Sequence, residues 1–193
     1  MARGPRRPRQ SARVRIIAGE LRGRHIEFDD AEGLRPTGDR VRETLFNWLQ
    51  SRICGARCLD LFAGSGALGF EAASRGAATV VMVEQNPQTV ARLRRTIAQL
   101  DAARVTLRQT SALELLSDTA ASEPFDLIFL DPPFATELLQ RCLDRLRNWP
   151  GLAIGGSCYV EFPESAPPRV PDEFGFLRRA RAGEVGFGLL QRR

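Results

Sequence analysis

The spacing of apolar residues predicts that the chain begins with a small extension. Two β-prone runs, at about 13–18 and 23–28, flank a glycine-containing turn and predict a hairpin. A breaker cluster at 35–39 comes next, and the apolar residues beyond it have the spacing of one helix face: Val41, Leu45, Trp48 and Leu49. The first third of the chain therefore predicts a hairpin followed by one amphipathic helix.

From residue 57 the pattern changes to strands that alternate with helices. Apolar runs predict strands at about 58–62, 78–83, 104–108, 125–130 and 156–162, and a final hairpin at 174–181 and 185–191. A helix is predicted after each of the first four strands. The first ends near residue 75, the second begins at 86–87, and the third and fourth lie at about 113–116 and 136–147. This alternation predicts a Rossmann-like α/β fold with a doubly wound, mainly parallel seven-stranded sheet and a C-terminal antiparallel hairpin.

Length and composition fit one domain with a basic extension. We expect a flexible basic arm at 1–12 and a single domain at 13–193, which comprises the hairpin at 13–34, the helix at 35–56 and a core at 57–193. No apolar run approaches the roughly 18 residues of a membrane span, and the N-terminus has no apolar stretch typical of a secretory signal. A cytoplasmic monomer is expected.

The residue types exclude several kinds of chemistry. All 28 basic residues are arginine, so no Schiff-base or P-loop lysine is possible. His25 is the single histidine, which argues against a catalytic triad and against a site with several histidines. The four cysteines form no C-x-x-C pair, so we expect buried, reduced thiols and no metal site.

The net charge of +5 is localised at the N-terminus. Residues 1–13 carry five arginines and no acid, and the rest of the chain is balanced. The absence of lysine alone is explained by a GC-rich genome, whereas the clustering points to phosphate binding.

A glycine-rich turn lies between the strand at 58–62 and its helix. The segment Gly64-Ser65-Gly66-Ala67-Leu68-Gly69 matches G-x-G-x-x-G, in which glycines let the backbone approach a cofactor closely. By itself this motif favours NAD, FAD and S-adenosylmethionine about equally.

Carboxylates at three strand ends separate these cofactors. Asp60, Glu84 and Asp131 each end a predicted parallel strand, and the carboxyl edge of such a sheet is where ligands bind. A dinucleotide brings a pyrophosphate, which disfavours nearby carboxylates. S-adenosylmethionine instead brings a sulfonium and an ammonium, so the three acids favour it.

The motif Asp131-Pro132-Pro133-Phe134 predicts an exocyclic amine as the methyl acceptor. Asp131 and the Pro132 carbonyl can accept the two amine N–H bonds and direct the lone pair at a methyl group. The prolines keep the backbone stiff, and Phe134 can stack on a base.

Together these motifs resemble class I methyltransferases. The segments Arg15-Ile-Ile-Ala-Gly19, Leu21-Arg-Gly-Arg24 and Arg35-Pro-Thr-Gly-Asp-Arg-Val-Arg-Glu-Thr-Leu-Phe-Asn47 are similar to those of the RsmD family, the 16S rRNA (guanine(966)-N(2))-methyltransferases. The resemblance covers the chain from about residue 13 to its end.

The resemblance implies S-adenosylmethionine as donor, a guanine N2 amine in 16S rRNA as acceptor, and either the small subunit or an assembly intermediate as partner. The expected catalytic residues are Asp131, Pro132, Pro133 and Phe134. The expected cofactor-binding residues are Asp60, Phe62, Ala63, Gly64, Ser65, Gly66, Glu84, Gln85, Ser111 and Ala112. Candidates for RNA contact are Arg22, Arg24, Arg40 and Arg42, together with the arm.

Three alternatives and one departure remain open at this point. An adenine-N6 DNA or RNA methyltransferase would use the same Asp-Pro-Pro-Phe geometry, and a nucleotide-binding oxidoreductase or a non-catalytic RNA-binding module would share other features. Many related enzymes also place an acid after the third core strand, whereas this chain has Gln109-Thr-Ser111-Ala112 there.

Overall fold

The hairpin and the first helix form where the apolar pattern predicts them. In a computed structural model, which describes residues 11–29, 38–118, 123–134 and 136–193, β1 (Ser11–Arg15) pairs antiparallel with β2 (His25–Asp29). Helix α1 (Asp39–Trp48) follows and buries Val41 and Leu45. Most of the predicted arm, and the breaker cluster up to residue 37, lie outside the described residues.

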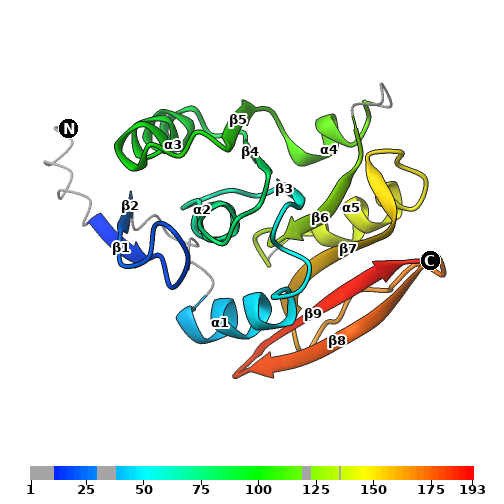
Figure 1. The fold of residues 1–193 in the computed structure, drawn as a ribbon. Coiled ribbons are helices and arrows are strands. Elements are labelled where there is room, and N and C mark those ends of the chain that lie inside the picture. Colours follow the sequence, from blue (N-terminus) through cyan, green and yellow to red (C-terminus); the bar gives the residue numbers. More distant parts are fainter. Residues whose placement is uncertain (1–10, 30–37, 119–122, 135) are drawn as a thin grey trace, which may run out of the picture.

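Seven strands form one sheet in the predicted doubly wound arrangement (Figure 1). Its strand order is β5-β4-β3-β6-β7-β9-β8. The first five strands in that order run parallel. Strand β9 pairs antiparallel with both of its neighbours, β7 and β8. The strands are β3 (Arg57–Asp60), β4 (Thr79–Glu84), β5 (Val105–Gln109), β6 (Phe125–Leu130), β7 (Leu152–Pro163), β8 (Phe174–Ala182) and β9 (Val185–Arg192).

Four more helices connect the parallel strands. They are α2 (Ala67–Ser74), α3 (Pro87–Leu100), α4 (Ala112–Leu115) and α5 (Leu138–Leu146). Helix α3 begins as the sequence predicts, because the Asn86 side chain accepts hydrogen bonds from the Gln88 and Thr89 backbone N–H groups and Pro87 occupies the first turn.

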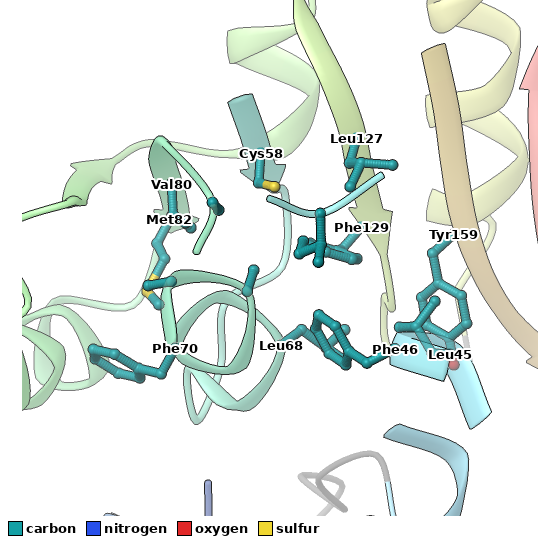
Figure 2. Close-up of a cluster of buried hydrophobic side chains, with 14 of the residues drawn as sticks. Leu45, Phe46, Cys58, Leu68, Phe70, Val80, Met82, Leu127, Phe129 and Tyr159 are labelled. Carbon is teal, nitrogen blue, oxygen red and sulfur yellow. The ribbon is translucent and has the colours of Figure 1, made fainter. Parts of the chain in front are cut away.

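The central strands β3 and β6 and the C-terminal part of β7 are buried on both faces, which explains their nearly continuous apolar runs. Helices α1, α2 and α3 cover one face, where Phe46 and Leu68 pack near Phe129 and Tyr159 (Figure 2). Helices α4 and α5 cover the other face with Leu139, Leu143 and their neighbours. From Leu127 to Leu130, successive residues of β6 alternate between the two clusters, as the period of a strand requires.

The hairpin is attached to α2 through a buried carboxylate. Glu71 accepts hydrogen bonds from the backbone N–H groups of Ile17 (2.8 Å) and Ala18 (3.1 Å). Arg42 lies 3.6 Å from Glu71 and also donates to the Arg15 carbonyl and to Asp39. Arg42 is completely buried. The prediction that it contacts RNA is therefore wrong, since its guanidinium binds the hairpin to α1 and α2.

Two other expectations need correction. Strand β7 starts at Leu152, before the predicted 156, because an irregularity near Gly155 and Gly156 interrupts its register with β6 without ending the strand. Cys54 is exposed, whereas Cys58, Cys142 and Cys158 are buried free thiols as expected.

None of the helices in the described segments is long and apolar enough to cross a membrane.

Candidate active site

The predicted site residues lie together at the point in the sheet where the strand order changes direction. Strands β4 and β5 extend the sheet on one side of β3, and β6 and β7 extend it on the other. The carboxyl ends at such a switch point form a ligand crevice in open α/β sheets. A cleft of about 1670 Å³ lies there, lined by Asp60, Glu84 and Asp131 from three different strands.

Asp60 is the deepest carboxylate of the cleft. It is 2% exposed, and the Phe62 N–H donates to it at 3.3 Å. Burial raises the pKa of Asp60 to about 7, although backbone hydrogen bonds from Phe62 and Gly69 lower it. A cation placed beside this group would favour its ionised form.

The glycine-rich turn and Glu84 are joined by hydrogen bonds. The Glu84 carboxylate accepts from the backbone N–H groups of Gly64 (3.1 Å) and Asn86 (2.8 Å), which fixes its orientation at the cleft. Gly66 adopts a left-handed conformation with φ of 84° at the start of α2. Unlike the other predicted cofactor residues, Gly66 does not line the cleft, so its contribution is to the shape of the turn.

The remaining predicted cofactor residues line the same cleft: Phe62, Ala63, Gly64, Ser65, Gln85, Ser111 and Ala112. The Ser111 hydroxyl accepts a hydrogen bond from the Glu114 N–H (3.2 Å) and caps α4. The Ser111 hydroxyl thus has a role in the helix itself.

The Asp-Pro-Pro-Phe segment extends from β6 across the cleft. Asp131 is half-buried, Pro132 is buried, and the Phe134 side chain is 42% exposed. The Pro133 carbonyl accepts a hydrogen bond from the Thr136 hydroxyl (2.7 Å), which supports the turn. The segment thus places a carboxylate and an exposed aromatic ring together in the cleft that contains Asp60.

Four charged residues that line the cleft were not predicted from the sequence: Glu161, Glu164, Arg181 and Glu184. Glu161 is 4% exposed near the end of β7, and Arg181 lies exposed near the end of β8. A signal for Glu161 was present, because an acid within the apolar run Cys158–Phe162 is unusual for a strand buried on both faces.

The other RNA-contact candidates lie outside the cleft lining. Arg22, Arg24 and Arg40 are exposed, and Arg24 also donates to the Gln99 carbonyl of α3 at 3.0 Å. Within the described residues there is no group of three or more His, Cys, Asp or Glu side chains that could hold a metal ion.

The sheet order, the glycine-rich turn and the carboxylates at the strand ends define a class I methyltransferase. The chain belongs to the family described as Conserved hypothetical protein 95, whose model matches residues 14–191. This confirms the RsmD resemblance of the sequence.

Relatives of known name support this assignment. The chain is 42% identical over 183 residues to "Ribosomal RNA small subunit methyltransferase D" of Escherichia coli K12, with 94% of this chain and 91% of that protein covered. The protein of the same name from Haemophilus influenzae is 39% identical, with 95% of this chain and 96% of that protein covered.

Solved structures agree in fold. One from Escherichia coli is 40% identical and gives a TM-score of 0.84, covering 94% of this chain and 99% of that one. An RNA methyltransferase from Salinibacter ruber, in complex with S-adenosyl-L-homocysteine, is 17% identical with a TM-score of 0.64, covering 82% and 94%. This second likeness concerns the fold alone.

Proposed function

We propose that this protein transfers a methyl group from S-adenosylmethionine to the exocyclic N2 amine of a guanine in small-subunit (16S) rRNA. The observation that carries the proposal is the placement of Asp131, the two prolines and Phe134 in one cleft with Asp60 and Glu84. The names of the relatives supply the substrate, small-subunit rRNA.

The residues of the cleft fit the cofactor. Asp60 offers a buried carboxylate that a cationic ligand would hold ionised, and the turn at Gly64 lets the backbone approach closely. Glu84, oriented by two backbone N–H groups, is placed to accept from ribose hydroxyls. When bound, S-adenosylmethionine supplies an electrophilic methyl group on a sulfonium.

The acceptor amine is positioned by the Asp-Pro-Pro-Phe segment. An exocyclic amine delocalises its lone pair into the ring and is a poor nucleophile. Asp131 and the Pro132 carbonyl each accept one N–H bond, which turns the lone pair towards the methyl group, and Phe134 stacks on the base. The nitrogen forms its bond to carbon as the sulfur–carbon bond breaks, and it then releases a proton to water, so no strong base is needed.

Nucleoside analysis tests the proposal. Unmodified small subunits, free 16S rRNA and an assembly intermediate would each be incubated with the protein and labelled S-adenosylmethionine, and the product digested to nucleosides. N2-methylguanosine is the expected product, mapped to one position. N6-methyladenosine would replace the proposal with adenine methylation. No transfer to any of the three substrates would overturn it.

Methylation of the small subunit, free 16S rRNA and the assembly intermediate, measured side by side, also identifies which of them is the substrate. We expect a monomer that acts in the cytoplasm on rRNA in the small subunit or in an assembly intermediate. Size-exclusion chromatography with light scattering checks the oligomeric state, and a dimer would contradict the expectation.

A further inference from the structure

Glu161 lies beside Asp131 at the carboxyl edge of the sheet. Strands β6 and β7 are parallel, and their last paired residues are Leu130 and Val160. The residues that follow this pair are Asp131, directly after the end of β6, and Glu161 on β7. The two acids therefore follow neighbouring strands, which lie about 4.8 Å apart. Both line the cleft.

The Glu161 side chain is held in place. Its Oε1 accepts a hydrogen bond from the Tyr159 hydroxyl at 2.7 Å, and both residues are buried. The burial of Tyr159 raises its pKa well above the ordinary value, so it remains a donor. A carboxylate has about four acceptor positions, so the bond from Tyr159 occupies only one of them.

A guanine presents two kinds of donor along one edge. Its N1–H group is adjacent to the N2 amine, whereas adenine has a lone pair at N1 beside its amine. Two carboxylates on neighbouring strands match two adjacent donors. A carboxylate facing a lone pair would instead leave two acceptors in contact, which is unfavourable in a buried site.

We propose that Glu161 accepts the N1–H bond of the target guanine and thereby determines the specificity of the cleft for guanine. This inference rests on the proposed function, since it requires the N2 amine to be held by Asp131. Tyr159 acts as a positioning residue for the Glu161 carboxylate.

The analogue 2-aminopurine tests this role. It retains the 2-amino group but has a lone pair at N1. Small subunits would be reconstituted with 16S rRNA that carries either guanine or 2-aminopurine at the position that the wild-type protein methylates, and kcat/KM measured for each. We expect the wild-type protein to prefer guanine by about 10- to 100-fold, because 2-aminopurine would leave the buried Glu161 carboxylate without this hydrogen bond.

Glu161→Gln should reduce this preference to less than about threefold. The glutamine amide can donate to the N1 lone pair of 2-aminopurine, and it has one oxygen fewer for the guanine N1–H. Asp131→Ala is the matched contrast: both bases carry the 2-amino group, so kcat/KM should fall for both and their ratio should stay unchanged. Affinity for S-adenosylmethionine, measured by calorimetry, should remain that of the wild-type protein in Glu161→Gln.

Several results would overturn the inference. An unchanged ratio in Glu161→Gln, with kcat/KM lowered equally for both bases, would make Glu161 merely structural. Equal kcat/KM of the wild-type protein for guanine and 2-aminopurine would show that the N1–H group is not recognised. If Glu161→Gln fails to fold, Tyr159→Phe carries the test, because loss of its hydroxyl should lower the ratio at least threefold. Absence of guanine N2 methylation by the wild-type protein would instead overturn the proposed function.

Discussion

Asp131 concentrates the expected chemistry in one side chain. We expect Asp131→Ala to lower kcat at least about a hundredfold, because the amine would no longer be held in line with the methyl group. Affinity for S-adenosylmethionine should change less than about twofold, since Asp131 is assigned to the acceptor. Single-turnover methylation and calorimetry measure the two quantities.

A matched control lies on the same strand. Asp126 is exposed near the start of β6 and accepts a hydrogen bond from the Arg57 N–H at 2.8 Å, far from the carboxyl edge. Asp126→Asn should leave kcat unchanged. Near-normal turnover by Asp131→Ala would remove Asp131 from the mechanism.

Asp60 links cofactor binding to stability. Its pKa is about 7 in the folded protein against 3.8 for the free side chain, mainly because of burial. The folded state therefore holds this proton more tightly, and the associated stability is fully present below about pH 3.8 and lost as pH rises through 7. Asp60→Asn should raise the free energy of unfolding at pH 8 by on the order of 2–4 kcal/mol, an advantage that disappears near pH 4.

The same substitution should impair cofactor binding. A cationic ligand needs the ionised carboxylate, so wild-type affinity for S-adenosylmethionine should weaken as pH falls below about 7. Asp60→Asn should bind at least about tenfold more weakly at pH 8 and lose this pH dependence. Urea unfolding and calorimetry across pH 4–8 measure both effects. A variant that binds as well as the wild-type protein would contradict the assignment of Asp60.

At the scale of elements, helix periodicity predicted α1 but not the role of its polar residues. Val41, Leu45 and Leu49 are buried as expected. Arg42 follows Val41 directly, and local sequence gives no sign that the hairpin and α2 would enclose its guanidinium. The position of a polar side chain within a tertiary contact depends on residues far along the chain, here Glu71, and the periodic pattern does not contain that information.

The contact between the hairpin and α2 depends on a glycine. Gly19 has a φ of 85°, and a Cβ atom there would lie 1.8 Å from the Ser74 carbonyl oxygen. Gly19→Ala should therefore separate the turn from α2. We expect a loss of at least about 2 kcal/mol in the free energy of unfolding and faster hydrogen exchange at the Ile17 and Ala18 amides, which donate to Glu71.

Gly23 provides the matched control for this prediction. Its φ is 82°, but a Cβ atom there would meet nothing within 4 Å. Gly23→Ala should cost only the backbone strain, about 1 kcal/mol, and leave exchange at Ile17 and Ala18 unchanged. Equal effects of the two substitutions would mean that strain, and not the contact with α2, determines the loss.

At the scale of the molecule, the position of the site followed from topology. Asp60, Glu84 and Asp131 were placed at one edge because parallel strands align their carboxyl ends, and the cleft contains all three. Glu161 was not predicted because the sequence does not reveal that β7 lies beside β6 with Val160 opposite Leu130. The neighbour of a strand in a sheet is a long-range property, whereas strand ends are local.

The charge distribution separates RNA binding from cofactor binding. The net charge of +5 equals the number of arginines in residues 1–13, while the cleft is lined by several acids. We expect removal of residues 1–10, which leaves β1 in place, to weaken rRNA binding and to reduce the slope of log K against log salt by up to about 3. Affinity for S-adenosylmethionine should not change, because that site belongs to the strand ends.

Substitution of Arg3, Arg6, Arg7 and Arg9 by glutamine is the control that keeps the length of the arm. It should reproduce both effects of the deletion, since phosphate neutralisation depends on charge and not on chain length. Filter binding of rRNA at several salt concentrations measures the slope. An unchanged slope in both variants would assign RNA binding to the exposed arginines Arg22, Arg24 and Arg40 and leave composition as the reason for the basic arm.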